Sequence, residues 1–323
     1  MHSPFYLAPM AELSHRALRE LIEIFGSCDE YFTEMISANA LVQGGQFEAW
    51  YIDALPVPEK TVYQLLGSNS DILAKAVSIL DKYDCAGIDI NMGCSAPLIT
   101  RSGAGVTLMA DKDKAGDLMR VLRKRTEKRL SCKIRIGMED DFDYLVSFCK
   151  RLEAEGLDLI TLHPRTAKEK FKRLARWDYV RRLKSELAIP VAGNGDIASA
   201  QELLRKSDGS CSAIMIGRLA VRCPWVFAEA RHIEKGGLWD ASGINLEEIS
   251  LRFLDLLTKY QPAEFHTSRA HRFFSCFCDN FTWGGHLKTL IGREKELSAV
   301  SGVLKSYFRE NPEEKFEKSV RNR

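Results

Sequence analysis

Short apolar runs alternate with amphipathic stretches along the first two thirds of the chain. The apolar runs, rich in β-branched residues, lie at 5–10, 31–37, 61–67, 87–93, 132–137, 159–165, 189–195 and 213–218. Between most of them apolar residues recur at helical spacing, as at 71–84, 112–127, 141–155 and 198–206. Strand and helix in repeated alternation predict a parallel sheet. Eight units within about 220 residues favour a closed (β/α)8 barrel, and no GxGxxG follows the first run, as an open dinucleotide-binding sheet would have.

The strand pattern stops near residue 240, and only helical patterns follow. Segments 246–260, 266–281 and 293–309 have helical periodicity, and Asn245 is a suitable N-cap for the first of them. We therefore predict an α/β fold in which a TIM barrel is followed by a small all-helical domain. The expected boundaries are 1–240 for the barrel, 241–312 for the helices and 313–323 for a charged, disordered tail.

Composition excludes several classes of protein. No apolar run approaches the ~18 residues of a membrane span, and the first residues do not resemble a secretory leader, so we expect a cytoplasmic protein. The nine cysteines include no CxxC pair, which argues against a disulfide framework or a zinc site, and we expect no metal. A formal net charge of +2 does not by itself indicate a nucleic-acid partner.

Glycines and an arginine follow the last two predicted strands. The seventh runs into Asn194, Gly195 and Asp196, and the eighth into Gly217 and Arg218. Reactive groups in barrels lie at the carboxyl ends of strands, and a phosphate is commonly held after strands seven and eight. Glycine lets backbone N–H groups approach phosphate oxygens, and arginine can chelate them. The pattern indicates a phosphorylated cofactor, with glycines that merely close tight turns as the alternative.

Cys94 follows the fourth predicted strand, in a loop that contains Gly93 and Gly103. This position would bring a thiol to the substrate instead of burying it. With an ordinary pKa near 8.5 the side chain would be mostly a thiol at neutral pH, able to donate a proton. We therefore treat Cys94 as a candidate general acid.

Two cations lie on the fifth predicted strand, and a histidine ends the sixth. Lys133 and Arg135 are two residues apart and share one face of a strand. A lysine there could stabilise the negative charge of a reduced flavin, although a salt bridge inside the barrel explains the pair equally well. His163 ends the sixth strand and is followed by Arg165, which makes a polar cluster at the same end of the barrel.

A dense basic segment follows the sixth predicted strand directly. Residues 165–184 hold nine lysines or arginines against two acidic residues, a net charge of +7. Such a cluster attracts a polyanion through counterion release and exceeds the need of a small-molecule site. It favours nucleic acid as a partner, with a solvated basic helix face as the alternative.

As a set, the motifs resemble the tRNA-dihydrouridine synthase family in order and spacing. They are APM at 8–10, VYQLLGS at 62–68, INMGC at 90–94, CKIRIG at 132–137, LHPRT at 162–166, GNGDI at 193–197 and IGR at 216–218. The likeness spans residues 5 to about 235 and is looser in the helical part. It implies an enzyme with bound FMN that reduces the C5=C6 bond of uridine in tRNA, with NADPH as reductant. A ligand of the size of tRNA does not require a dimer, and we expect a monomer.

The resemblance also implies a role for particular residues. Cys94 matches the catalytic cysteine, which would protonate C5 after hydride transfer from the flavin to C6. Asn91 would lie near both flavin and uracil, and Arg165 would help to hold the target nucleotide. The implied FMN-binding residues are Pro9, Met10, Gln64, Lys133, His163, Asn194, Gly195, Asp196, Gly217 and Arg218.

The sequence departs from the family pattern at two places. The family commonly has proline directly after the cysteine, whereas Ser95 and Ala96 precede Pro97 here. The stretch after Thr166 lacks the usual glutamine at its fourth position. Two other functions stay open: an FMN barrel enzyme of the dihydroorotate dehydrogenase kind that acts on a free pyrimidine, and a non-catalytic RNA-binding protein. The basic segment and added helices argue against the first, and Cys94 with Lys133 against the second.

Overall fold

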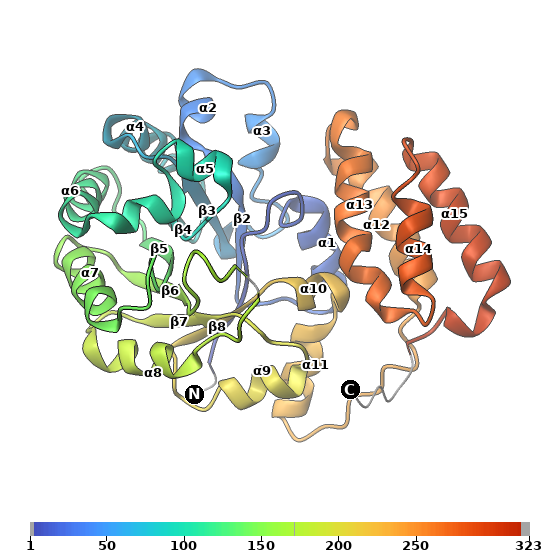
Figure 1. Cartoon of the computed structure of the whole chain (residues 1–323). Coiled ribbons are helices and arrows are strands. Elements are labelled where there is room, and N and C mark those ends of the chain that lie inside the picture. Colours follow the sequence, from blue (N-terminus) through green and yellow to red (C-terminus); the bar gives the residue numbers. More distant parts are fainter. Residues whose placement is uncertain (1–2, 171, 318–323) are drawn as a thin grey trace.

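Eight parallel strands form a closed barrel in the computed structural model, which describes residues 3–170 and 172–317 (Figure 1). The last strand closes the ring by pairing with the first, with Ile214 opposite Phe5. All eight predicted strands are present, so the predicted barrel is confirmed. The strands are β1 (Phe5–Leu7), β2 (Glu30–Ser37), β3 (Thr61–Leu66), β4 (Gly87–Met92), β5 (Leu130–Arg135), β6 (Leu159–His163), β7 (Val191–Asn194) and β8 (Ala213–Ile216).

Helices surround the barrel and then form a separate group beside it (Figure 1). Those of the barrel part are α1 (Arg16–Phe25), α2 (Ala38–Gln43), α3 (Glu48–Tyr51), α4 (Ser70–Leu80), α5 (Pro97–Arg101), α6 (Lys112–Arg123), α7 (Phe142–Ala154), α8 (Trp177–Glu186), α9 (Ala200–Lys206), α10 (Arg218–Arg222) and α11 (Val226–Glu234). The C-terminal helices are α12 (Leu246–Tyr260), α13 (His266–Phe277), α14 (Gly284–Ile291) and α15 (Leu297–Glu310). None of the helices in the described ranges is both long and apolar enough to cross a membrane.

The alternation of side chains along the strands separates two layers of core. In β4, Ile88, Ile90 and Met92 pack outward against the helices, while Asp89 and Asn91 point into the barrel. The floor of the barrel is a small apolar cluster that contains Tyr6, Phe32, Val62, Leu159, Ala192, Ala213 and Met215. Polar side chains lie above this floor, nearer the carboxyl ends of the strands. The fold therefore gathers chemistry-bearing groups at one end of the barrel.

The C-terminal helices have their own aromatic core. Phe253 of α12 stacks on Phe273 of α13, with 3.7 Å between ring centroids. The side chain of Asn245 accepts the backbone N–H of Glu248 at 3.0 Å, as predicted for the N-cap of α12. Helix α14 was not predicted, because its first two residues are glycines, which weaken a helical pattern.

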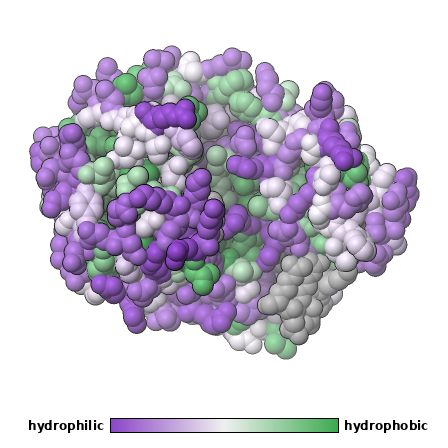
Figure 2. Space-filling view, viewed as in Figure 1, coloured by the Kyte–Doolittle hydropathy of each residue, from purple (hydrophilic) through white to green (hydrophobic). Residues whose placement is uncertain are grey.

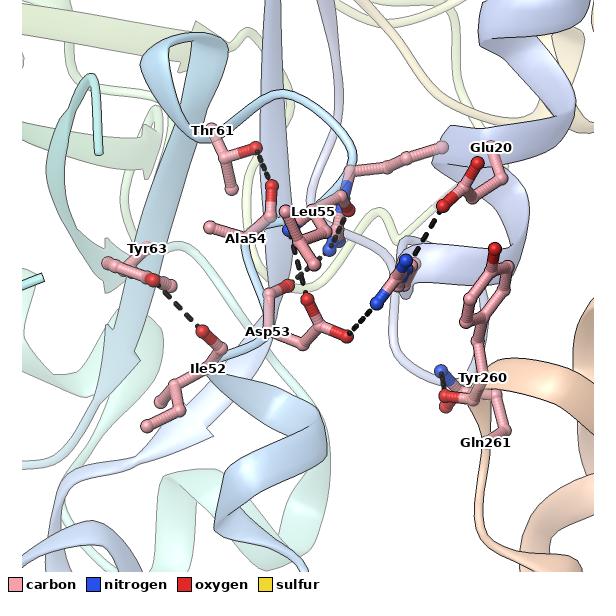
Figure 3. A network of polar contacts seen from close by, with 11 residues as sticks. Glu20, Ile52, Asp53, Ala54, Leu55, Thr61, Tyr63, Tyr260 and Gln261 are labelled. Carbon is pink, nitrogen blue, oxygen red and sulfur yellow. Dashed lines mark hydrogen bonds and ion pairs between the residues drawn. The ribbon is translucent and has the colours of Figure 1, made fainter. Parts of the chain in front are cut away.

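Ion pairs and cation–π contacts join the C-terminal helices to the barrel. Arg16 binds Asp53 at 3.2 Å and Glu20 at 3.0 Å while its guanidinium lies 3.8 Å from the ring centre of Tyr260 in α12 (Figure 3). A second pair is fully buried, with Nη2 of Arg269 in α13 at 3.1 Å from the Glu34 carboxylate in β2. These contacts fix α12 against α1 and α13 against β2.

The first residues of the predicted tail are packed against the C-terminal helices. Glu314 is buried and accepts the backbone N–H of Thr282 at 3.0 Å. Leu246 donates its N–H to the carbonyl of Lys315 at 2.7 Å. Residues 313–317 of the expected tail therefore contact this part of the protein, because the acidic side chain finds a hydrogen-bond donor in the turn before α14. Residues 318–323 lie outside the described residues.

Candidate active site

A cavity of about 290 Å³ opens at the carboxyl ends of the strands. In the same view as Figure 1, the surface is hollowed between the barrel and the C-terminal helices, and apolar residues lie in the depth of the hollow (Figure 2). The cavity brings together all the predicted site residues except Gln64. Those that line it are Pro9, Met10, Asn91, Cys94, Lys133, His163, Arg165, Asn194, Gly195, Asp196, Gly217 and Arg218.

Hydrogen bonds from three directions hold the backbone around Cys94. Oδ1 of Asn91 accepts the N–H of Cys94 at 3.0 Å, and Arg135 donates to the carbonyl of the preceding residue at 3.0 Å. The carbonyl of Cys94 accepts the N–H of Val106 at 2.9 Å. Gly105 makes this last approach possible, since its φ is +64° and a Cβ there would overlap the Cys94 carbonyl oxygen. The loop fixes the thiol at the cavity although Ser95 and Ala96 precede its proline.

Positive charge dominates the cavity wall. Lys133 on β5 is half-buried, and desolvation, followed by repulsion from Arg135, lowers its pKa to about 8. Arg135, Arg165 and Arg218 add three further cations to the lining, whereas Asp196 is its one acidic residue among those the structure describes. Such a wall favours an anionic ligand.

Arg165 connects two other predicted site residues. Its Nη2 lies 2.6 Å from both carboxylate oxygens of Asp196, and its Nη1 lies 3.0 Å from Nε2 of His163. Because a guanidinium only donates, Nε2 of His163 is the acceptor and the ring proton is on Nδ1. Desolvation and the neighbouring cations Lys133, Arg135, Arg165 and Arg218 lower the pKa of His163 to about 2. The imidazole is therefore neutral at physiological pH.

The turns after β7 and β8 bring backbone close to the cavity. The Asn194 amide donates to the carbonyl of Met215 at 2.8 Å, which ties the two strand ends together. Gly195 has a φ of +120°, and a Cβ there would lie 2.9 Å from Cδ2 of His163. This glycine therefore lets the imidazole pack directly on the turn. Gly217 and Arg218 follow β8 and begin α10.

Gln64 lies below the cavity and does not line it. Its side chain is fully buried in the barrel, where Nε2 donates to Asp89 at 2.7 Å and Oε1 accepts from Asn91 at 2.9 Å. Period-two alternation predicts which face of β3 carries this residue, but not its depth.

Eight of the residues that line the cavity were not among the predicted site residues, and two of them are Arg135 on β5 and Met35 on β2. Arg135 was noticed beside Lys133 but assigned no role, although the alternation that placed Lys133 at the site applies equally to it. Met35 also lines the cavity. The pairing of β2 with β3 shifts register between Phe32 and Met35, and such an irregularity has no clear signal in the sequence.

Many cations of the basic segment 165–184 have acidic partners within the protein. Arg176 binds Glu169 at 2.6 Å and Asp140 at 3.2 Å, and Lys168 pairs with Glu139. Arg165 is buried against Asp196, as described above. The net charge of the segment therefore overstates the positive surface, because residues from other loops neutralise part of it. No cluster of metal-binding side chains is found within the described ranges.

Comparisons with known proteins identify the family of the chain. The family model described as "Dihydrouridine synthase (Dus)" matches residues 6–262. The tRNA-dihydrouridine(16) synthase of Neisseria meningitidis serogroup B is 27% identical, over 94% of this chain and 94% of its own length. A probable tRNA-dihydrouridine synthase of Aquifex aeolicus is 32% identical, over 80% and 81%, and tRNA-dihydrouridine synthase B of Pasteurella multocida is 31% identical, over 69% and 67%. The chain therefore belongs to the dihydrouridine synthase family of enzymes.

Proposed function

We propose that this protein is a tRNA-dihydrouridine synthase, which reduces the C5=C6 bond of uridines in tRNA. The observation that carries the proposal is the position of Cys94, a proton donor held at the wall of a cation-lined cavity. The names of the relatives, each a tRNA-dihydrouridine synthase, support the same substrate class.

The cavity residues fit FMN. Met10 and Pro9 offer an apolar surface for the ring system, and Lys133 offers a cation for the part of the ring that becomes negative on reduction. The backbone at Gly217 and the Arg218 side chain, both at the cavity, suit a phosphate. Asn194, Gly195 and Asp196 would border the same phosphate side. Gln64 lies below the cavity and bonds Asn91 at its wall, and its contact with the pyrimidine edge of the ring stays a prediction.

FMN held by these residues would supply hydride for C6 of uracil, with NADPH as its reductant. The C5=C6 bond is conjugated to the C4 carbonyl, so addition at C6 leaves enolate character between C4 and C5. The Cys94 thiol then donates its proton to C5, and solvent returns a proton to the thiolate. Asn91 holds the backbone of Cys94 and borders the uracil. Arg165 orients His163 and Asp196, which leaves it a smaller part in holding the nucleotide than the sequence suggested.

The residues around the cavity also suit a folded RNA as substrate. A uridine stacked in tRNA cannot reach a cavity at the end of a barrel, so the base has to be extruded. We propose that the helical region 241–312 holds the remainder of the tRNA beside the barrel. Exposed cations of the basic segment, such as Arg173, would contact its phosphates.

The test is dihydrouridine formation by the purified holoenzyme with NADPH. Unmodified tRNA, free uracil and free orotate are compared as substrates, each with the wild-type protein and with Cys94→Ala. We expect product only in tRNA, and a loss of about 100-fold or more in the variant, the range of a missing general acid.

Two results would contradict the proposal. Bound and reducible flavin with product from a free pyrimidine, but none on any tRNA, would indicate a small-molecule reductase of the dihydroorotate dehydrogenase kind. A protein that binds tRNA but neither flavin nor NADPH would indicate a non-catalytic RNA-binding protein.

A further inference from the structure

A continuous line of hydrogen bonds runs inside the barrel and ends on the backbone of Cys94. Ser131 on β5 donates to Oδ1 of Asp89 at 2.6 Å, and Gln64 on β3 donates to Oδ2 of the same carboxylate at 2.7 Å. Asn91 donates to Oε1 of Gln64 at 2.9 Å and accepts the N–H of Cys94 at 3.0 Å. The line therefore connects a carboxylate below the cavity with the loop that carries the thiol.

The direction of this line is fixed at both ends. An ionised carboxylate only accepts hydrogen bonds, so the amide group of Gln64 that faces Asp89 must be its NH2. At the other end the backbone N–H groups of Gly93 and Cys94 only donate, so the atom of Asn91 that faces them must be its oxygen. Each amide consequently has a single orientation that satisfies all of its neighbours.

Bulk solvent does not reach the line. Asp89, Gln64 and Ser131 are fully buried, and Asn91 is 7% exposed. If the Asp89 acceptor is removed, the Gln64 amide loses the partner that fixes its orientation and can turn over. It would then present NH2 to Asn91, whose own amide would have to turn and oppose the Cys94 N–H with a donor. A change below the cavity thus reaches the thiol loop through two amide side chains.

We propose that Asp89 is a positioning residue, which acts through Gln64 and Asn91 to hold the Cys94 loop in the conformation that presents the thiol to the substrate. The inference rests on the proposed function, in which Cys94 is the proton donor. Asp89 itself does not line the cavity and touches neither substrate nor cofactor in this scheme.

Keeping the Asp89 carboxyl charged costs free energy, because the side chain is buried away from water. Desolvation raises the pKa of its carboxyl to about 6, against hydrogen bonds from Ser131 and Gln64 and attraction to Lys133 and Arg129, which lower it. A buried group of this kind usually has a structural or functional reason to persist. The line of hydrogen bonds to Cys94 supplies such a reason.

Asp89→Ala, Asp89→Asn and a matched control separate this role from a general effect on folding. Alanine removes the acceptor, whereas asparagine keeps an acceptor for Gln64 if its NH2 turns to the Ser131 hydroxyl. The control is Thr161→Val, a nearly isosteric change of a buried hydroxyl that has no hydrogen-bond partner among the described residues and lies opposite Lys133 in the sheet. All three variants are compared with the wild-type holoenzyme.

The first readout is amide hydrogen exchange in a peptide that spans residues 92–97, together with the midpoint of global unfolding. We expect Asp89→Ala to accelerate exchange of the Gly93 and Cys94 amides at least tenfold. We expect Asp89→Asn and Thr161→Val to stay within threefold of the wild type. The second readout is dihydrouridine formation, for which kcat should fall at least tenfold in Asp89→Ala while KM for tRNA stays within twofold.

Unchanged exchange at Cys94 in Asp89→Ala, or a loss in Asp89→Asn as large as in Asp89→Ala, would overturn the inference. If Asp89→Ala does not fold, Gln64→Met breaks the middle of the line without removing the carboxylate, and it must then accelerate the same exchange in the flavin-free protein. A wild-type protein that makes no dihydrouridine would defeat the proposed function alone, because the exchange measurement does not depend on activity.

Discussion

The Nη2 atom of Arg165 lies 2.6 Å from each carboxylate oxygen of Asp196. The arginine follows β6 and the aspartate follows β7, so the pair joins two neighbouring loops of the cavity. The Asp196 carboxylate also accepts the backbone N–H of Ala175 at 2.7 Å. The family resemblance assigned Arg165 to the target nucleotide and Asp196 to FMN. In the structure the two side chains bind each other.

We expect Asp196→Ala to lower the free energy of unfolding by about 3 kcal/mol, because removing one member of a buried pair leaves the other charge uncompensated. The Arg165 side chain is only 3% exposed and has further cations nearby. Urea denaturation of the flavin-free protein measures the loss. The control is Glu139→Gln, which breaks an exposed pair with Lys168 and should change stability by about 0.5 kcal/mol or less. Equal effects in the two variants would contradict the role of burial.

His163 should make the protein less stable in mild acid. Its pKa is about 2 in the folded protein, below the ordinary value of 6.5, so between these values the unfolded chain binds a proton that the folded protein does not. The stabilisation is present above pH 6.5 and is lost as the pH falls. At pH 5 the loss from this group is about 2 kcal/mol. Urea denaturation at pH 7 and pH 5 should show a smaller difference for His163→Asn, and an unchanged difference would refute the assignment.

Gly105→Ala should disturb the Cys94 loop more than a comparable change elsewhere. Gly44 has a similar φ of +71° but no atom within 4 Å of an added Cβ. Gly44→Ala therefore reports a single energy term, the backbone strain of an L side chain at positive φ. That term is about 1 kcal/mol. In Gly105→Ala the new methyl group also meets the Cys94 carbonyl oxygen, so we expect a larger loss of stability and a lower kcat for dihydrouridine formation. Similar stability and activity in the two variants would show that the Cys94 loop can shift to accommodate the added methyl group.

The buried pair between Arg269 and Glu34 predicts a partial rescue. Arg269→Met leaves the Glu34 carboxylate buried without its cation and should lower the free energy of unfolding by about 3–5 kcal/mol. Burial already raises the pKa of Glu34. The double variant Glu34→Gln/Arg269→Met removes both charges, and denaturation should show that most of the loss is recovered. A double variant less stable than Arg269→Met would show that the carboxylate has another essential partner.

The sequence was sufficient to predict the barrel, because parallel strands buried on both faces leave short apolar runs at regular intervals. It also predicted that the residues at the strand ends lie close together, since strand ends in a barrel share one rim. It could not predict the depth of Gln64, because alternation gives the face of a strand and not the height of a side chain above the barrel floor. The cavity, by contrast, follows the predicted strand ends closely.

Pairings between distant residues were the other limit. Nothing in the order of residues says that Asp196 neutralises Arg165 or that Glu139 and Asp140 face the basic segment. These partners meet only after the loops have packed, so local charge counts overestimate the free positive charge. The same reason explains why the acidic residue Glu314 is buried where a solvated tail was expected.

The pairing of β1 with β8 has a consequence for the order of events during biosynthesis. Met10 comes from one end of the barrel sequence and Arg218 from the other, yet both line the same cavity. A nascent chain still on the ribosome therefore lacks the complete cavity proposed for the flavin until residues beyond Arg218 have emerged. Capture of flavin should consequently be a late event in synthesis, and a chain released before β8 should stay colourless however much of its helical shell has formed.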